Sequence, residues 1–411
     1  MSFPVTTDTD HTLVNKVSPG TAVEPKATDV QQRVSKEQNP DPLPLLLTPL
    51  TIRGCSIKNR LWLSPMCMYS ANNGLVNDFH FVHYMQFAVR GAGLVMLEAT
   101  AVLPEARITP GCLGIWSDEH IGELKRLATA MKRCGTVAGI QLGHSGRLGS
   151  SIPLNKYAEA DLYKVDADSG GWPDRVFGPS PIPFSSQFCT PKELDKARID
   201  EIQSAFVDAA VRADKAGFDV IDIHAAYGML LNQFLSPTSN KRTDGYGGSF
   251  ENRIRMLIEV VERVRRVWPP DKLMFVSLPV LEGVDGGWSA DDAISLARVL
   301  SSKGVDMSEL SVGGNSPDAK ISGDPVFKME LVCKVKQQLP GYLVAAVGVA
   351  SSGMQANRVL EEGCADAVFS GRQYLRNPSF VLSAASDLGV NVQWIDQYQC
   401  ARPNLKYDTF F

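Results

Sequence analysis

Polar and titratable side chains follow segments that have the composition of buried strands. The clearest case is the apolar run 218–223, rich in β-branched residues, which leads into His224 and Tyr227. Buried parallel strands have this composition, and their carboxyl ends are where α/β sheets and barrels place their chemistry. For this strand taken alone, a histidine satisfied within the core is the favoured interpretation. Other predicted strands end in the same way, which favours a functional site.

Four more side chains with useful chemistry lie near predicted strand ends. Gln141 and Thr100 can each donate and accept hydrogen bonds, Cys67 is a thiol with apolar neighbours, and Ser277 lies in the fifth strand. Asp222 and His224 are two residues apart on the same predicted strand, so their side chains point to the same face. Asp222 therefore either contacts His224 or fills a barrel interior. We find no Ser–His–Asp order, no carboxylate pair, no phosphate loop of the Walker type and no zinc-ligand spacing.

Glycines and one arginine follow the last three predicted strands. Gly313 follows the sixth strand, Gly348 the seventh, and Gly371 and Arg372 the eighth. Backbone amides that glycine exposes near helix starts bind anions, and an arginine adds a fixed positive charge. Barrels often hold a phosphate after strands seven and eight. We therefore expect a phosphate-bearing ligand or cofactor here, although loop glycines and a surface arginine would explain either motif alone.

Eight strand-like segments alternate with eight helical segments, which predicts parallel strands and right-handed crossovers. We predict an α/β fold with a single (β/α)8 TIM barrel, an N-terminal hairpin cap around Gly54 and a long insertion after strand 3. A doubly wound open sheet is the alternative. The strands are expected at 60–64, 94–98, 137–142, 218–224, 273–278, 307–311, 342–347 and 365–370, and the helices at 79–90, 119–133, 199–216, 251–268, 290–303, 327–338, 351–362 and about 372–385.

The chain divides into three predicted parts. Residues 1–43 are polar and proline-containing and predict a mobile N-terminal arm, residues 44–388 form the barrel, and residues 389–411 form a C-terminal tail. The insertion between Gly143 and about Arg198 leaves the third strand at the expected catalytic face. A loop of this length inside a compact domain is usually functional, so we expect a lid.

Composition limits the function classes. The chain has 411 residues with 44% hydrophobic and 21% charged residues, which is typical of a soluble globular protein. The net charge of −4 gives no reason to expect a nucleic-acid or membrane partner. No secretory signal is visible, and the eight cysteines are scattered without a CxxC pair. We therefore expect reduced thiols and a cytoplasmic location.

Several motifs together resemble the old yellow enzyme family of flavin-dependent ene reductases, in its thermophilic-like class. The resemblance spans about residues 45–390. The motifs are Asn59-Arg60, Ser64-Pro65-Met66-Cys67-Met68-Tyr69, Gly114 to His120, Gln141 to Arg147, Gly217 to Ala226, Phe234 to Pro237 and Arg242 to Ser249.

This resemblance implies a TIM barrel that binds FMN without a covalent bond. The flavin would take a hydride from NADPH and pass it to the β-carbon of an activated C=C bond in a small molecule, while a proton goes to the α-carbon. The substrate would be an enone or enal, including a fungal or bacterial specialised metabolite. The family's intersubunit arginine near the C-terminus also leaves room for a homo-oligomer, with Arg402 as the candidate residue here.

The resemblance assigns roles to individual residues. Catalytic roles fall on His224, which would bond the substrate carbonyl, on Tyr227 and Tyr69 in the substrate pocket, and on Cys67, which would tune the flavin potential. The residues implied for cofactor binding are Pro65, Met66 and Cys67 along the flavin, Thr100 and Gln141 at its ring edge, and Gly313, Gly348, Gly371 and Arg372 around the phosphate.

Three positions depart from the family pattern. Tyr227 replaces the second oxygen-binding residue, Met229 replaces the tyrosine that donates the proton, and Ser277 replaces a cation near the flavin. A thioether cannot give a proton. The sequence therefore leaves three functions open: an ene reductase with another proton source (Tyr227, Tyr69 or water), a redox-neutral isomerase or cyclase, and a flavin-binding protein without turnover.

Overall fold

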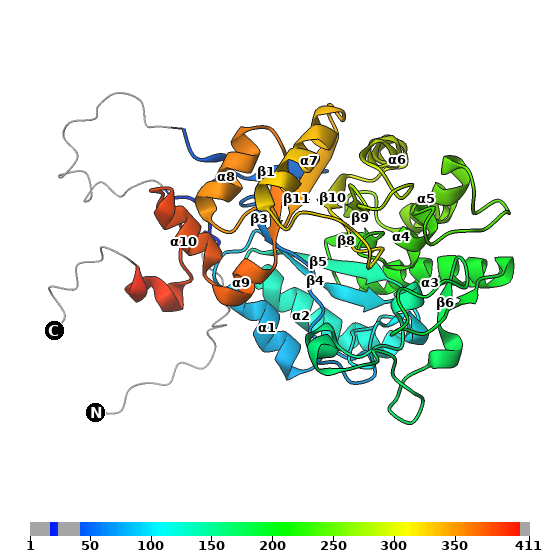
Figure 1. Ribbon diagram of the computed structural model, residues 1–411. Coiled ribbons are helices and arrows are strands. Elements are labelled where there is room, and N and C mark those ends of the chain that lie inside the picture. The colour runs from blue at the N-terminus through cyan, green and yellow to red at the C-terminus, as the bar shows by residue number, and fades with distance from the viewer. Residues whose placement is uncertain (1–16, 24–41, 403–411) are drawn as a thin grey trace, which may run out of the picture.

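The structure, a computed structural model, describes residues 17–23 and 42–402. Its centre is a closed barrel of eight parallel strands in sequential order, which confirms the predicted TIM barrel and excludes the open sheet (Figure 1). The strands are β3 (Leu61–Leu63), β4 (Leu94–Ala101), β5 (Val137–Gly143), β8 (Val220–His224), β9 (Leu273–Pro279), β10 (Met307–Ser311), β11 (Leu343–Val347) and β12 (Ala367–Ser370).

Helices surround the barrel because each buries one apolar stripe against the strands. In α5, for example, Ile254, Leu257, Val261 and Val264 are buried, and the Ser249 side chain accepts a hydrogen bond from Asn252 N at the amino terminus. The helices are α1 (Asp78–Ala88), α2 (Ile121–Arg133), α3 (Lys196–Lys215), α4 (Leu230–Leu235), α5 (Phe250–Val267), α6 (Ala290–Ser302), α7 (Pro325–Gln337), α8 (Gly353–Glu361), α9 (Arg372–Arg376) and α10 (Phe380–Asp387).

Two helical segments differ from the sequence prediction. The eighth predicted helix is two helices, α9 and α10, which are separated at Asn377 and Pro378. Proline restricts the preceding residue to extended conformations and cannot continue the backbone ladder, so the helix ends there. The short helix α4, directly after Met229, was not predicted. It is too brief to show a helical period, but it fixes the loop that leaves β8.

The N-terminal hairpin closes the bottom of the barrel. Strands β1 (Leu50–Ile52) and β2 (Cys55–Ile57) are antiparallel, and the turn residues Arg53 and Gly54 both have positive φ, as a two-residue hairpin turn needs. Ile52 and Ile57 pack with interior residues of the barrel such as Trp62 and Phe275. The predicted hairpin cap is therefore confirmed.

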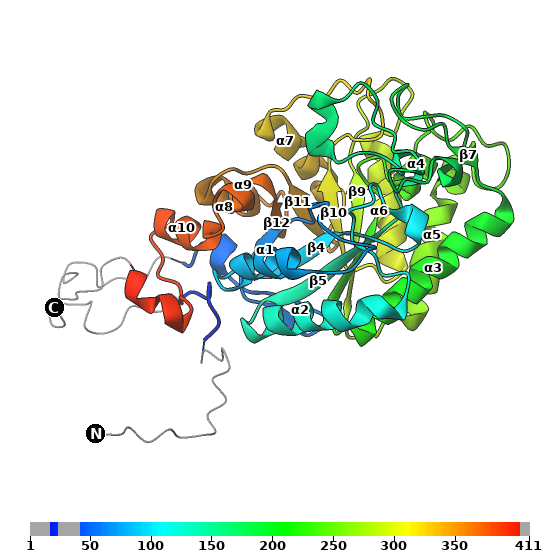
Figure 2. The same cartoon turned by 90° about the horizontal axis from the view of Figure 1, so that it is seen from below.

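The insertion after β5 is tied to the loops at the barrel mouth. Arg147 donates hydrogen bonds to the carbonyls of Ile182 (3.3 Å) and Pro183 (3.4 Å), and also to the carbonyl of Asn315 after β10. Within the insertion, β6 (Phe177–Gly178) pairs with β7 (Lys192–Glu193), and this small sheet lies against α4 (Figure 2). The insertion thus spans two sides of the mouth, while its action as a lid stays a prediction.

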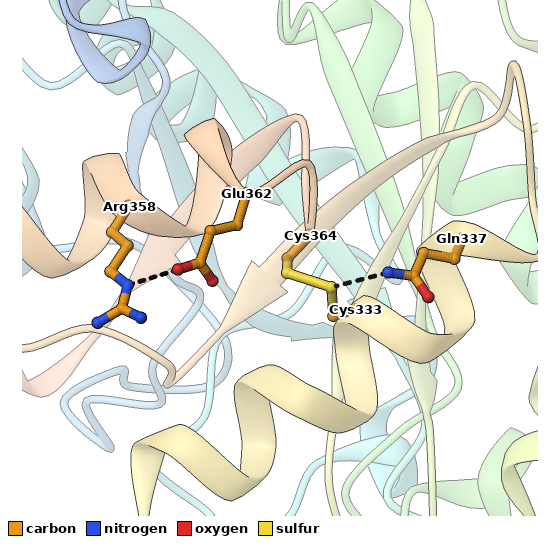
Figure 3. The surroundings of a disulfide bond; sticks show 5 residues. All are labelled: Cys333, Gln337, Arg358, Glu362 and Cys364. Atoms are coloured by element: carbon orange, nitrogen blue, oxygen red, sulfur yellow. Dashed lines mark hydrogen bonds and ion pairs between the residues drawn. A yellow bond between two sulfur atoms is a disulfide. The ribbon is translucent and has the colours of Figure 1, made fainter.

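One pair of cysteines corrects the expectation that all eight thiols are reduced. Cys333 on α7 and Cys364 before β12 form a disulfide, with Cα atoms 4.0 Å apart (Figure 3). The two residues are 31 positions apart, and only the packing of α7 beside the turn that follows α8 brings them together. The expectation failed because it was based on spacing along the chain. The cytoplasmic location stays a prediction.

The division into arm, barrel and tail also stays a prediction. Within the predicted arm, residues 17–23 lie against the start of the predicted tail: Gly20 N donates to Gln393 O (2.7 Å), and Val23 N donates to Asn391 O (2.9 Å). The remaining arm residues, 1–16 and 24–41, and the tail residues 403–411 lie outside the described part of the chain. Across residues 17–23 and 42–402, no helix has both the length and the apolar character to cross a membrane.

Candidate active site

Strand register places the predicted site residues in one band around the barrel mouth. Gln141 on β5 lies opposite Ala99 on β4 and Asp222 on β8, while His224 lies opposite Ser277 on β9. Ser277 in turn lies opposite Glu309 on β10. Side chains that come from four different strands are therefore neighbours at one level of the barrel interior.

The centre of this band is a buried polar cluster. Gln141 Nε2 donates to Asp222 Oδ2 (2.7 Å) and to Ser277 Oγ (3.1 Å), and the Ser277 hydroxyl also donates to Asp222 Oδ2. Burial raises the pKa of Asp222 to about 6, although both hydrogen bonds favour its charged form. The amide nitrogen of Gln141 is thus turned toward the protein.

Glu309 completes a pair of buried acids that the sequence analysis did not expect. Asp222 is 0% exposed and Glu309 2%, and Asp222 Oδ1 and Glu309 Oε2 have no hydrogen-bond partner among the described residues. Burial, followed by the charge of Asp222, raises the pKa of Glu309 well above its ordinary value. The expectation of no carboxylate pair is therefore wrong. The sequence offered one signal of this acid, namely its place within the predicted buried strand 307–311. The pair itself forms only because β8, β9 and β10 lie side by side in the closed barrel.

His224 lies at the mouth as a neutral imidazole. It is 5% exposed, and burial lowers its pKa to about 3. Its Nδ1 has no hydrogen-bond partner among residues 17–23 and 42–402. The ring centroids of His224 and Tyr227 are 6.1 Å apart, so the two predicted catalytic side chains are close together. A neutral histidine has one N–H donor and one acceptor nitrogen to offer a ligand.

Tyr227 has an unusual backbone for a bulky residue. Its φ is +52°, and it packs directly against Gly314, where an added Cβ would lie 2.6 Å from Tyr227 Cα. A side chain at residue 314 would collide with it, so glycine is needed after β10. Tyr227 is 40% exposed. Burial, followed by the charge of Glu309, raises its pKa to about 12, whereas a hydrogen bond with Ser311 and the charge of Arg372 act in the opposite direction.

Met229 occupies the position where the resemblance expects a proton-donating tyrosine. It is 7% exposed and lines a small cavity of about 10 Å³ together with His144 and Arg107. His144 Nε2 is buried without a partner among the described residues, and burial lowers the His144 pKa to about 3. A cavity of this volume holds at most one water molecule.

Cys67, in the loop after β3, lies beside a second thiol, that of Cys112 in the chain that follows β4. A hydrogen bond to Cys112 raises the pKa of Cys67 well above its ordinary value, and burial adds to this shift. Met68 N donates to Glu98 Oε2 (3.0 Å), which fixes the loop to β4, and burial raises the Glu98 pKa to about 8. Tyr69 has φ +52°, and burial raises its pKa. The sequence analysis missed Cys112, because nothing in its local pattern marks it.

The glycines and the arginine after β11 and β12 form the other side of the mouth. Gly348 is exposed with φ +70°, and a Cβ placed there would meet nothing within 4 Å. Gly371 lies beside Met66, whose sulfur would be 3.0 Å from an added Cβ. Arg372 is exposed and forms no ion pair with any described residue. Gly313 differs from the others, since its amide donates to Leu281 O (2.9 Å).

These residues fit FMN. The free guanidinium of Arg372 and the open space at Gly348 suit a phosphate. The segment Pro65, Met66 and Cys67 follows β3 and lies next to Gly371. Thr100 Oγ1 donates to Glu98 O (2.8 Å) and keeps its lone pairs to accept a hydrogen bond from a flavin ring donor. His224, whose Nδ1 has no hydrogen-bond partner among the described residues, ends β8 at the same mouth. Three or more His, Cys, Asp or Glu side chains with the geometry of a metal site occur nowhere in the described residues.

Comparison with known proteins agrees with this geometry. The family described as NADH:flavin oxidoreductase / NADH oxidase matches residues 45–391. An NADPH dehydrogenase of a Geobacillus species is 41% identical over 357 residues, which cover 86% of this chain and 98% of the relative. An NADH:flavin oxidoreductase of Gibberella zeae is 39% identical over 370 residues, covering 86% of this chain and 88% of that protein.

Solved structures agree as well. Morphinone reductase in complex with tetrahydroNAD has a TM-score of 0.69 and 26% identity, covering 89% of this chain and 99% of that one. The old yellow enzyme homologue of Zymomonas mobilis, at 24% identity, shares the fold with a TM-score of 0.68, covering 85% of this chain and 94% of that one. The chain therefore belongs to the NADH:flavin oxidoreductase / NADH oxidase family, the old yellow enzymes, and is an FMN oxidoreductase with NADPH as its electron donor.

Proposed function

We propose that this FMN oxidoreductase reduces an activated C=C bond, that of an enone or enal, in a small molecule. The observation that carries the proposal is the neutral His224 at the mouth, with Tyr227 beside it. Two hydrogen-bond donors at one point suit a carbonyl oxygen. They stabilise the negative charge that develops there when a hydride reaches the β-carbon of the conjugated alkene.

In this reaction the cofactor and the protein side chains have separate roles. FMN, when bound, supplies the hydride that it has received from NADPH. His224 donates its N–H to the carbonyl oxygen and orients the alkene, while Tyr69 lines the pocket. Because His224 has a pKa of about 3, it stays neutral at pH 7 and acts as a donor without carrying charge.

The proton for the α-carbon requires another source than residue 229. Of the three sources left open by the sequence, Tyr227 is favoured. Burial and the charge of Glu309 raise its pKa to about 12, so it stays protonated at neutral pH, and its ring lies beside His224. The Tyr69 hydroxyl is also protonated, but it comes from the opposite part of the mouth, after β3, where Cys67 and Cys112 surround it.

Two half-reactions test the proposal separately. Anaerobic addition of NADPH should bleach the flavin absorption, and 2-cyclohexenone should then restore it and yield the saturated ketone. In His224→Ala the second step should slow by about a hundredfold, the usual effect of removing one oxyanion donor. His224→Gln, which keeps an N–H donor, should recover part of this loss. A flavin that NADPH leaves unbleached, or an alanine variant as fast as the parent, contradicts the proposal.

A redox-neutral reaction, isomerisation or cyclisation of a specialised metabolite, is a second candidate. Met229 and Ser277 favour it, because a thioether cannot give a proton and a serine does not carry the positive charge that stabilises a reduced flavin. The distinguishing measurement is mass spectrometry of candidate products with and without NADPH. A product of unchanged mass that forms without NADPH supports the second candidate, and a product that gains two hydrogens only with NADPH excludes it.

A further inference from the structure

Glu98 lies at an irregularity of strand β4. The register between β4 and β5 shifts between Leu97 and Ala99, so Glu98 has no partner on β5. Leu94 and Met96 pack in the barrel interior, and a regular alternation would turn Glu98 the same way. A bulge adds one residue and re-aims the side chains around it. The Glu98 side chain accordingly lies on the outer side of the barrel wall, against α1, where it is 0% exposed.

The carboxyl of Glu98 connects helix α1 with the loop after β3. On one side, the Tyr84 hydroxyl of α1 donates to Oε1 (3.1 Å) and accepts a hydrogen bond from Glu98 N (3.0 Å). His80 Nε2, also on α1, lies 3.7 Å from the same oxygen. On the other side, Met68 N donates to Oε2 (3.0 Å). Buried polar networks whose members are paired rigidify the segments that they join.

The loop after β3 needs such an anchor because its backbone is unusual. Tyr69 has a left-handed backbone, with φ +52°, and a bulky residue keeps this conformation only where the surrounding structure holds it. Met68 N, which donates to Glu98, holds the residue directly before Tyr69. Asn77 Nδ2 donates to Ser70 O (2.6 Å) and holds the residue directly after it. The loop is therefore fixed on both sides of its strained residue.

The same loop lies next to the place that FMN is expected to occupy. An added Cβ at Gly371 would be 3.0 Å from the sulfur of Met66, and the half-buried Cys67 lies between Met66 and the anchored Met68. A shift of the Met68 backbone would therefore move the thiol of Cys67 relative to a bound cofactor. Small misplacements of positioned groups have large effects on rate.

We propose that Glu98 is a positioning residue for the flavin, which fixes the loop of Cys67 through Met68 N and thereby sets the affinity and the reduction rate of bound FMN. Glu98 acts through the loop and does not itself touch the cofactor. The inference goes beyond the proposed function, because it concerns FMN and its reduction by NADPH and holds for any substrate that later reoxidises the flavin.

Two substitutions of Glu98 separate its hydrogen bond from its volume. Glu98→Gln keeps an oxygen that accepts from Met68 N and adds an amide that can donate to the Tyr84 hydroxyl. Because burial raises the pKa of Glu98 to about 8, the acid is neutral at pH 7, and glutamine resembles it closely. Glu98→Leu has a similar volume but accepts no hydrogen bond. At pH 7 we expect the glutamine variant to match the parent in the measurements below.

Hydrogen exchange of the flavin-free protein tests the contact itself. The Met68 amide should exchange about tenfold faster in Glu98→Leu, because a backbone group without its partner opens more readily, and at the parent rate in Glu98→Gln. Fluorescence titration with FMN and anaerobic reduction by NADPH test the consequence. The leucine variant should bind FMN about tenfold more weakly and be reduced about tenfold more slowly, since the loop is misplaced.

Tyr342→Phe is the control for a general loss of stability. The buried Tyr342 hydroxyl shares a hydrogen bond with Ser308 Oγ (2.9 Å) at the amino end of β11, the end of the barrel opposite to the loop after β3. We expect this variant to lower the melting temperature and to leave FMN affinity and the reduction rate unchanged. Tyr84→Phe, which removes the α1 side of the network, should show the effects of Glu98→Leu in weaker form. It provides the test if the leucine variant does not fold.

A leucine variant that exchanges, binds FMN and is reduced like the parent would overturn the proposal. Equal losses in Glu98→Leu and Glu98→Gln would also overturn it, since glutamine keeps the hydrogen bond. Equal losses in Glu98→Leu and Tyr342→Phe would show general destabilisation instead. Reoxidation by 2-cyclohexenone tests the proposed function separately: if the enone leaves the reduced flavin unchanged, the proposed function fails while the role of Glu98 stands.

Discussion

The two sides of the barrel mouth are built from opposite chemistry. After β11 and β12, the chain presents Gly348, Gly371 and the unpaired cation of Arg372 to the open mouth. Strands β8, β9 and β10, the last of which pairs with β11, enclose Asp222, Ser277 and Glu309, where two acids are buried without a cation. We call these the phosphate side and the acid side.

The difference indicates how a ligand with a phosphate at one end is oriented. A phosphate is attracted to the open phosphate side, where backbone and guanidinium donors are free. It is repelled by the negative charge of Asp222 on the acid side, where burial makes the repulsion strong. We therefore expect the phosphate side to provide affinity for the ligand, and the acid side to hold a buried negative charge that keeps the phosphate away from it. The three predictions that follow test this division.

The largest expected effect is on the phosphate side. Arg372→Ala should weaken FMN binding between tenfold and a hundredfold, since a hydrogen bond to a charged group contributes about 1.5–3 kcal/mol. Fluorescence titration of the flavin-free protein with FMN measures this directly. Arg376→Ala, at the other end of the same helix and also exposed, is the matched control. Equal losses of FMN affinity in both variants would show that Arg372 has no specific role in binding the phosphate.

A smaller effect is expected from a new donor near the acid side. Met229→Tyr should raise the rate of enone reduction about tenfold if proton delivery limits turnover, because a positioned general acid accelerates such steps. Met229→Phe is the control, since it adds the ring without the hydroxyl. A rate that does not change in the tyrosine variant would show that another group already delivers the proton. An equal gain with phenylalanine would point to pocket shape.

The smallest effect concerns stability against pH. Glu98, with a pKa of about 8 in the folded protein and 4.5 as its ordinary value, holds a proton that the unfolded chain has lost. The folded state therefore binds more protons between pH 6.5 and 7.5, so the free energy of unfolding should fall by about 1 kcal/mol per pH unit as pH rises.

Urea unfolding at several pH values measures this slope. Glu98→Gln and, on the acid side, Glu309→Gln should each make it shallower, since the pKa of Glu309 is raised in the same direction. Arg372→Ala should leave the slope as it is, because the phosphate side holds no buried acid. A slope that changes as much in Arg372→Ala as in Glu309→Gln would contradict the division between the two sides.

Much of the fold was predictable because local patterns report it. Alternating strand and helix segments, with glycine at many joints, identified eight β/α units, and the structure has these units in that order. The substitutions at Tyr227, Met229 and Ser277 were also visible, since a motif shows which residue type stands at each place. The break between α9 and α10 was missed although Pro378 marks it, because the apolar pattern continues through the proline.

Other features depended on distances that no local pattern contains. Cys333 and Cys364 are joined only because α7 packs beside the turn after α8. Cys112 reaches Cys67 from a separate loop. Glu309 pairs with Asp222 only because the barrel closes with β9 between β8 and β10, and the register sets Ser277 opposite both His224 and Glu309.

The amino-acid sequence by itself determined the barrel, its family and the strand ends that carry the site. It did so because hydrophobic periodicity, turn residues and sequence motifs are all properties of short segments of the chain. The tertiary structure alone decided that the acid side holds two buried carboxylates, and that a tyrosine with a left-handed backbone packs against Gly314 and lies near His224. The physical reason is that a buried charge depends on every group around it, and these groups come from strands that are far apart in the chain.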